Sequence, residues 1–171
     1  EIPAHHPTAK NGQWVQGPKT ELLEAILEVA PAGKIVAEDL GIIPPSVIEL
    51  RKQNGIPGMA VLHFANDDVD NPHNPENHSE DTVVYTGTHD NDTTVGWGGK
   101  PVQDLIQDAL NSPANLAIIP LQDVMGLDSQ ARMNTPGTLD GNWEWRFDWD
   151  ELTNDSLNWF GQQVYRSGRG S

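Results

Sequence analysis

The sequence predicts an α/β fold in which a parallel sheet of about four strands is covered by helices. Short apolar runs alternate along the chain with amphipathic segments of helical periodicity. The apolar runs are hydrophobic almost throughout, which is typical of strands buried on both faces. Strands that are separated by helices favour parallel pairing, because the crossover helix returns the chain to the same end of the sheet.

The individual elements follow in order from local signals. In the first helix, Leu22, Ile26 and Val29 fall on one face, and Glu21 lies in the first turn, where a negative charge is favoured. The second helix has prolines 44 and 45 near its start and Gly55 as its terminal cap. The expected helices are 20–30, 44–55 and 101–112, with a short one in the tail; the expected strands are 34–40, 58–65, 82–87 and 115–124. Residues 66–81 are expected to form an irregular loop and 166–171 a flexible tail.

The composition excludes several classes of function. The formal net charge is −15, and binding to nucleic acid needs a clustered excess of Lys and Arg. The same charge disfavours anionic membranes, and no apolar run approaches the ~20 residues of a membrane-spanning helix. The chain has no cysteine, so neither thiolate chemistry nor a cysteine zinc site is expected. These features favour a protein with a neutral binding partner.

Polar side chains follow each of the four expected strands. The groups are Glu38-Asp39, His63-Phe64, the run THDND at 88–92 and Gln122-Asp123. Functional groups of parallel sheets and barrels gather just past the carboxyl ends of the strands. We therefore expect these groups to share one rim.

Two carboxylates on this rim suit acid/base chemistry on a glycosidic bond. Glu38 follows the apolar run IVA, where desolvation is expected to raise its pKa as a general acid requires. Asp90 lies among hydroxyls and amides that suit an ionised form, and His89 could bind sugar hydroxyls. Trp97, Trp143 and Trp145 could stack on sugar rings. Simpler interpretations remain open: a solvated turn at Glu38, an Asx-turn network at Asp90, and tryptophans that only pack. The Asp- and His-rich loop 66–81 could mimic a metal site, but its spacing fits neither an EF-hand nor a His-x₃-His pattern.

Several longer motifs together resemble a known family. They are IPAHHPTAKNGQWVQGP, IVAEDLGII, LRKQNGIPGMAVLHFA, VVYTGTHDNDTTVGW, LAIIPLQDVMGLDSQARMNTPGT and GNWEWR. This set resembles the 4-α-glucanotransferases, also called amylomaltases or disproportionating enzymes, in the α-amylase-like clan. The resemblance covers nearly the whole chain. It implies that residues 1–171 form the C-terminal part of a single (β/α)₈ catalytic domain, a partial TIM barrel.

The resemblance also implies a chemistry and a set of site residues. The family transfers a segment of a 1,4-α-glucan to another glucan with retention, using an Asp nucleophile, a Glu acid/base and an Asp that stabilises the transition state. By motif match Glu38 takes the acid/base position and Asp90 the stabiliser position. His89, Phe64 and Asn134 match substrate-binding positions, and Asp39 is a further substrate-binding candidate on the same rim. No metal or cofactor is implied. The expected location is cytoplasmic, or plastidial in a plant.

Two departures from the family pattern bear on these expectations. The family's nucleophile lies in a motif like R-x-D-H-F upstream of the opening segment, and this sequence does not contain it. The connection between VVYTGTHDNDTTVGW and LAIIPLQDV is also shorter than the family's. A retaining mechanism needs its nucleophile, so activity is expected only together with the missing N-terminal half of the barrel. The alternatives are a non-catalytic glucan-binding module and a glucan hydrolase on the same barrel.

Overall fold

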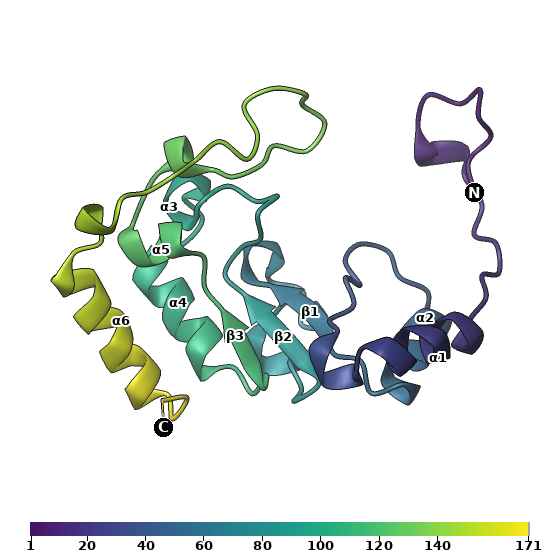
Figure 1. The fold of residues 1–171 in the computed structure, drawn as a ribbon, viewed down its shortest axis with the longest axis horizontal. Helices are drawn as coiled ribbons and strands as arrows, with labels where there is room; N and C mark the ends of the chain where they lie inside the picture. Colours follow the sequence, from purple (N-terminus) through teal and green to yellow (C-terminus); the bar gives the residue numbers. More distant parts are fainter. Residues whose placement is uncertain (171) are drawn as a thin grey trace.

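The computed structural model describes residues 1–170, which form a small parallel sheet with helices around it (Figure 1). The strands are β1 (Gly58–Val61), β2 (Thr82–Tyr85) and β3 (Leu116–Ile118), and they pair in the order β1-β2-β3. Both pairings are parallel, with Ala60 beside Val84 and Val84 beside Ala117. The expected α/β class with a parallel sheet is confirmed.

The expected strand at 34–40 is wrong, because this segment makes only part of a strand's ladder. The backbone N–H of Ala37 donates to the carbonyl of Pro57 at 2.9 Å, as a neighbouring strand would. At the next position the N–H of Met59 donates to Oδ1 of Asp39 at 2.8 Å. A side-chain carboxylate thus replaces the backbone carbonyl, and the segment runs beside β1 without becoming a strand.

The expected strand at 115–124 is too long. Pro120 has no N–H to give to a ladder, so β3 ends at Ile118. The helix α5 (Leu121–Met125) begins directly after the proline. Asp123 therefore lies in a helical turn and not at the end of a strand.

Three expected helices are confirmed with small changes of boundary. They are α1 (Thr20–Val29), α2 (Pro45–Gln53) and α4 (Val102–Asn111). The helix in the tail is α6 (Asn154–Arg166), and a further short helix, α3 (Thr94–Trp97), follows β2. The helices α3 and α5 lie at the same end of the sheet, the end where β2 and β3 finish (Figure 1). Within residues 1–170, no helix has both the length and the apolar character that crossing a membrane requires.

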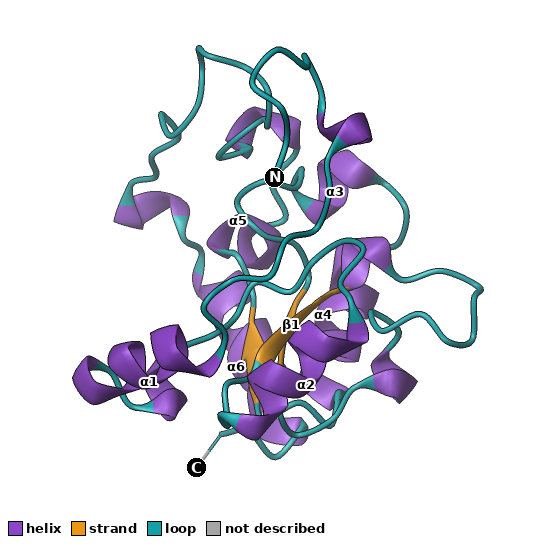
Figure 2. Ribbon diagram, turned by 90° about the vertical axis from the view of Figure 1, so that its right-hand side faces the viewer, coloured by secondary structure: helices purple, strands orange, loops and turns teal. Residues whose placement is uncertain are grey.

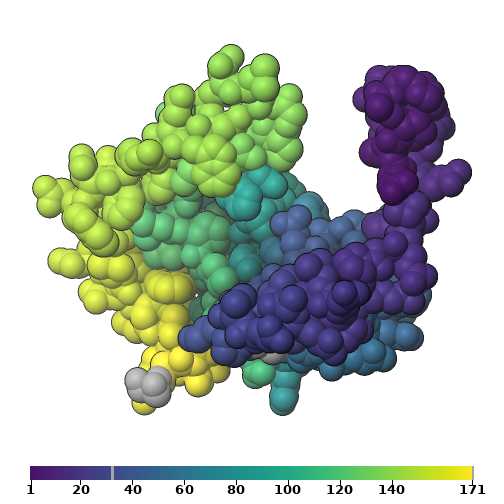
Figure 3. All heavy atoms as spheres, turned by 45° about the vertical axis from the view of Figure 1, so that its right-hand side comes forward, coloured from purple at the N-terminus to yellow at the C-terminus, as the bar shows by residue number. Residues whose placement is uncertain are grey.

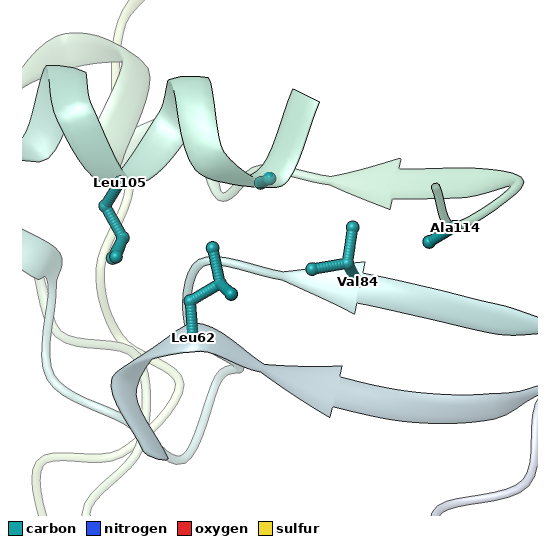
Figure 4. Packing of buried hydrophobic residues seen from close by; sticks show 5 residues of the cluster. Leu62, Val84, Leu105 and Ala114 are labelled. Atoms are coloured by element: carbon teal, nitrogen blue, oxygen red, sulfur yellow. The ribbon is translucent and has the colours of Figure 1, made fainter. Parts of the chain in front are cut away.

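The hydrophobic core lies between the sheet and α4. Leu62, Val84, Leu105, Ala109 and Ala114 form one buried cluster, and the labelled side chains converge between helix and strands in Figure 4. Leu105 and Ala109 are one turn apart on α4, so both face the sheet. Since strand residues alternate between faces, Met59, Tyr85 and Ile118 lie on the opposite face, where all three keep partial exposure.

Loops extend past one end of the strands (Figure 2). The loop 66–81 has only one short 3₁₀ turn, Pro75–Asn77, and asparagine side chains hold it together. The amide of Asn74 donates to the carbonyls of Asn66 and Asp68, at 3.0 and 2.9 Å. The amide of Asn71 donates to the carbonyl of Phe64 at 2.9 Å, which ties the loop to the end of β1. Side-chain amides thus supply the hydrogen bonds that secondary structure supplies elsewhere.

The end of the chain differs from the flexible tail expected at 166–171. Arg166 belongs to α6, and Arg169 donates to the carbonyls of Leu110, Ser112 and Ala114 at 2.6–2.7 Å. These carbonyls lie at and after the end of α4, where a helix leaves acceptors without partners. The guanidinium therefore fastens the described part of this segment to the core helix; Ser171 lies outside the described residues.

Replacing Arg169 by alanine is expected to lower the free energy of unfolding by about 1.5–3 kcal/mol, the scale of charge-assisted hydrogen bonds. Urea denaturation followed by circular dichroism measures the change. Arg166→Ala is the matched control, because Arg166 is exposed at the end of α6 and its loss should cost less than about 0.5 kcal/mol. Equal losses in the two variants would contradict the anchoring role.

Candidate active site

A cleft of about 1160 Å³ opens at the carboxyl end of the strands. Met59, Tyr85 and Ile118 from the exposed face of the sheet form part of its wall. Four of the predicted site residues line it together: Glu38, Phe64, His89 and Asp90. They come from three separate segments, one running beside β1, one following β1 and one following β2. The parallel sheet thus brings to one cleft groups that are far apart in sequence.

In space-filling view the N-terminal residues stand clear of the main body (Figure 3). The first 13 residues fold back on themselves, since the N–H of Gln13 donates to the carbonyl of Glu1 at 2.9 Å, and the next residue, Trp14, is 75% exposed. The segments 36–41 and 132–136 both contribute to the walls of the cleft.

The loop after β2 has a defined internal structure. The side chain of Asn91 accepts from the N–H and the hydroxyl of Thr88, both at 2.9 Å. The hydroxyl of Thr88 in turn accepts from the N–H of Asp90 at 3.3 Å. The loop is therefore closed by the Thr88 hydroxyl and by Asn91, which accepts from a residue three positions earlier, and not by the Asx-turn considered from the sequence. This turn presents Asp90 to the cleft.

The carboxylate of Asp90 has two polar neighbours. Nδ2 of Asn134 donates to its Oδ1 at 2.5 Å, and Nε2 of His89 lies 3.3 Å from the same oxygen. The Asp90 side chain is 48% exposed, so a ligand in the cleft can reach it. Asn134 is not part of the cleft wall, and it meets the site through Asp90.

Arg132 supports this arrangement and was not among the predicted site residues. Its Nη2 donates to the backbone carbonyl of Asp90 and its Nε to that of Asn134, both at 2.8 Å. The N–H of Asn134 donates to the carbonyl of His89 at 3.0 Å. Hydrogen bonds thus join the segment 132–134 to the loop that carries Asp90. The only sequence signal was the position of Arg132 two residues before Asn134 in the run RMN.

Glu38 is exposed at the cleft. The desolvation that its apolar neighbours led us to expect is not supplied by the residues described here, because Val36 is itself 39% exposed. Any dry environment for Glu38 must come from atoms that close over the cleft.

Asp39, the further substrate-binding candidate, is not among the residues that line the cleft. Its Oδ1 accepts from the N–H of Met59, and Oδ2 lies 3.1 Å from Nε of Arg51, an ion-pair contact without the alignment of a hydrogen bond. Gly58 makes this approach possible, since a Cβ there would lie 2.4 Å from Oδ2 of Asp39. Asp39 therefore fixes the segment that carries Glu38 to the edge of β1.

The aromatic residues divide into packing and site groups. Trp97 stacks on His63, with ring centroids 4.4 Å apart, and Trp145 stacks on Phe147 at 5.8 Å. Of the three candidate sugar platforms only Trp143 approaches the site, with its ring centroid 5.0 Å from that of His89. Phe64 is 44% exposed in the cleft.

Two histidines close to the cleft are held uncharged near neutral pH. Burial lowers the pKa of both His63 and His73, and it outweighs the nearby carboxylates. His73 lines the cleft, and its Nδ1 accepts from the N–H of Val61 at 3.1 Å, which places the ring proton on Nε2. His73 was missed from sequence because the loop 66–81 gave no periodic signal.

Among the residues that the structure describes, no group of three or more His, Asp or Glu side chains is placed to hold a metal ion. In 66–81 several polar side chains are engaged by backbone groups. Asn66, Asp68 and Asn71, for example, each accept from the N–H two residues on. The side chains in the cleft can instead bind hydroxyl groups, donate a proton and hold negative charge beside a bound molecule.

The fold and the cleft define an α/β protein with carboxylates, a histidine and an aromatic ring around one cleft beside a parallel sheet. The family model for 4-alpha-glucanotransferase matches residues 1–100 and 98–153. The chain therefore belongs to the 4-alpha-glucanotransferase family.

Similar proteins agree with this assignment. The chain is 45% identical to the chloroplastic/amyloplastic 4-alpha-glucanotransferase of Solanum tuberosum, over 85% of this chain and 29% of that protein. It is 46% identical to the 4-alpha-glucanotransferase of Synechocystis, over 92% of this chain and 35% of that one. Amylomaltase from Streptococcus agalactiae, in complex with acarbose, superposes with a TM-score of 0.88 at 28% identity, covering 99% of this chain and 39% of that one. The chain thus spans about a third of the length of these relatives.

The two matched segments of the family model meet at residues 98–100. These residues lie in the connection between α3 and α4. Gly98 there adopts a left-handed backbone with φ of 68°, which ends α3 and turns the chain toward α4.

Proposed function

We propose that this chain is the part of a 4-α-glucanotransferase that carries the acid/base Glu38 and the transition-state stabiliser Asp90, on a partial (β/α)₈ barrel. The observation that carries the proposal is the shared cleft, which brings together Glu38, Asp90 and His89 from separate segments. Membership of the family supports the substrate class, an α-1,4-glucan or maltooligosaccharide.

The proposed reaction has two displacements at the same anomeric carbon. An Asp nucleophile attacks that carbon, and Glu38 gives its proton to the departing glycosidic oxygen. In the second step the ionised Glu38 takes the proton from the 4-hydroxyl of an acceptor sugar as that oxygen displaces the nucleophile. Asp90 places negative charge beside the developing oxocarbenium ion, and His89 binds sugar hydroxyls. Proton and bond counts return to their starting state.

The nucleophile is proposed to come from the portion of the family's length that this chain does not cover. Two structural features support the need for that portion. The sheet face that carries Met59, Tyr85 and Ile118 keeps partial exposure, and Glu38 stands unshielded at the cleft. Both would be covered if further strands closed the barrel.

The test is glucose release from maltotriose, with the chain alone and with the chain joined to the remaining portion of the barrel. Activity is expected only in the second case, together with products longer than maltotriose, which distinguish transfer from hydrolysis. Release of glucose without longer products would support a hydrolase. Binding without turnover in the joined protein would support a glucan-binding module. Either result would overturn the transferase proposal.

A further inference from the structure

We propose that Asp123 is a positioning residue that clamps both ends of the loop carrying His89 and Asp90. Asp123 lies in the first turn of α5, outside the cleft, and is only 2% exposed. Its carboxylate accepts from the hydroxyl of Thr86 at 2.6 Å and from the hydroxyl of Thr94 at 2.8 Å. Its second oxygen accepts from the backbone N–H of Thr94, also at 2.8 Å.

The two threonines mark the beginning and the end of the loop. Thr86 directly follows β2, and Thr94 is the first residue of α3. Both threonines are fully buried. One carboxylate on a third element therefore sets the separation of the two ends of 87–93, and with it the position from which Asp90 extends.

A buried carboxylate is costly unless donors surround it, so this arrangement depends on all of its partners being present. Three donors converge on Asp123, and two of them come from Thr94. Loss of one hydroxyl would leave a buried oxygen under-satisfied, and the strain would fall on the loop between the threonines.

The clamp also reaches the end of β1. Nε2 of His63 lies 3.0 Å from the hydroxyl oxygen of Thr94. Because that hydroxyl gives its proton to Asp123, His63 must donate through Nε2–H, a tautomer assigned from the network. Gly87 passes close by, since a Cβ there would lie 3.0 Å from Cε1 of His63. The starts of the loops after β1 and β2 are thus held by one buried chain of hydrogen bonds.

This support differs from that of Arg132 and Asn134, which contact Asp90 directly. Asp123 contacts neither Asp90 nor His89 in the hydrogen-bond network, and it acts through the two threonines. Its effect on catalysis rests on the proposed function, whereas its effect on the loop does not.

The first experiment measures the loop in the chain itself. Amide hydrogen exchange is followed by NMR for Asn91, whose N–H donates to Thr88, for Asn134, whose N–H donates to His89, and for Ala109 in the core of α4. In Thr94→Val the first two amides are expected to exchange at least about 10-fold faster, with Ala109 nearly unchanged, because a local opening spares the core. Asp123→Asn should act in the same direction, and Thr94→Ser, which keeps the hydroxyl, should restore slow exchange.

Asp104→Asn is the matched control, because it removes the same charge as Asp123→Asn but from the exposed face of α4. If Asp123→Asn fails to fold, the comparison of Thr94→Val with Thr94→Ser still decides. Unchanged exchange at Asn91 and Asn134, or equal acceleration at all three amides, would overturn the clamp.

The second experiment uses the protein with its barrel completed and follows transfer from maltotriose. Thr94→Val is expected to lower kcat about 10- to 100-fold with little change in KM, because misplacing a catalytic group affects the transition state more than binding. Thr94→Ser should recover most of kcat. If exchange responds as expected but the wild-type protein transfers no glucan, the proposed function fails and the clamp stands. If Thr94→Ser and Thr94→Val change kcat and KM to the same extent as each other, the positioning role is wrong.

Discussion

Glutamine in place of Glu38 is expected to lower the rate of glucan transfer by the completed barrel about 10²–10⁴-fold, the usual contribution of a general acid. Glutamine keeps the size of the side chain, but it has no proton to give to the departing glycosidic oxygen. Glu38 is exposed in the cleft, so the substitution should leave the fold intact. Initial rates of glucose release from maltotriose measure the effect.

The leaving group separates a general acid from a merely structural carboxylate. In an aryl maltoside with an acidic phenol, the phenolate can leave without being protonated. The rate of the first step on this substrate should therefore fall far less in Glu38→Gln than the rate on maltotriose. Asp90→Asn is expected to lose about 10²–10³-fold on both substrates, because stabilising charge is needed whatever leaves. Glu49→Gln, on the exposed face of α2, is the control. Equal losses on the two substrates in Glu38→Gln would contradict the acid/base role.

Methionine in place of Arg51 is expected to lower the free energy of unfolding by about 3–5 kcal/mol, as when one partner of a buried ion pair is removed. Arg51 has 10% side-chain exposure, contacts the carboxylates of Asp39 and Asp81, and donates to the carbonyl of Ile56 at 2.8 Å. Methionine fills similar space but leaves Asp39, whose side chain is 14% exposed, without its cation. Urea denaturation at pH 7 gives the change.

Lys52→Met is the matched control, because the neighbouring Lys52 is exposed on the same helix and should change stability by less than about 0.5 kcal/mol. In the double variant Arg51→Met with Asp39→Asn, the loss should be smaller than the sum of the single losses, since the two side chains are in contact. Additive losses would show that the pair does not couple Arg51 to the segment that carries Glu38.

Much of the fold could be predicted from periodicity. The apolar spacing in 20–30 and 101–112 gave α1 and α4, and the uniformly apolar runs gave β1 and β2. The predicted strand at 34–40 was wrong. Its β-branched run fits a strand, but the side chain of Asp39, and not a backbone carbonyl, accepts the hydrogen bond from β1. The end of β3 could have been predicted, since Pro120 was visible inside the expected strand.

The positions of site residues could be predicted only where a general rule relates a residue's place in the sequence to its place in the fold. Parallel strands deliver their carboxyl ends to one edge, and this rule correctly grouped Phe64 and Asp90 in one cleft. Glu38 lines the same cleft, but it comes from a segment that runs beside β1 without being a strand. The roles of Arg132, His73 and Asp123 depend on hydrogen bonds between distant segments, and no local spacing encodes these. Asp123 was noted as a polar group at a strand end, but its partners Thr86 and Thr94 could not be read from the sequence.

The sheet ends at β3, and the outward backbone groups of this strand pair with no other strand among residues 1–170. Leu116 and Ile118 on it are 48% and 39% exposed, so the edge offers both hydrogen bonds and apolar surface to another molecule. The net charge of −15 opposes such contacts, because like-charged copies repel one another. Salt screens that repulsion and acid removes it near the pI of about 4.5. The colloidal stability of the isolated chain therefore rests on its charge more than on the shape of its sheet.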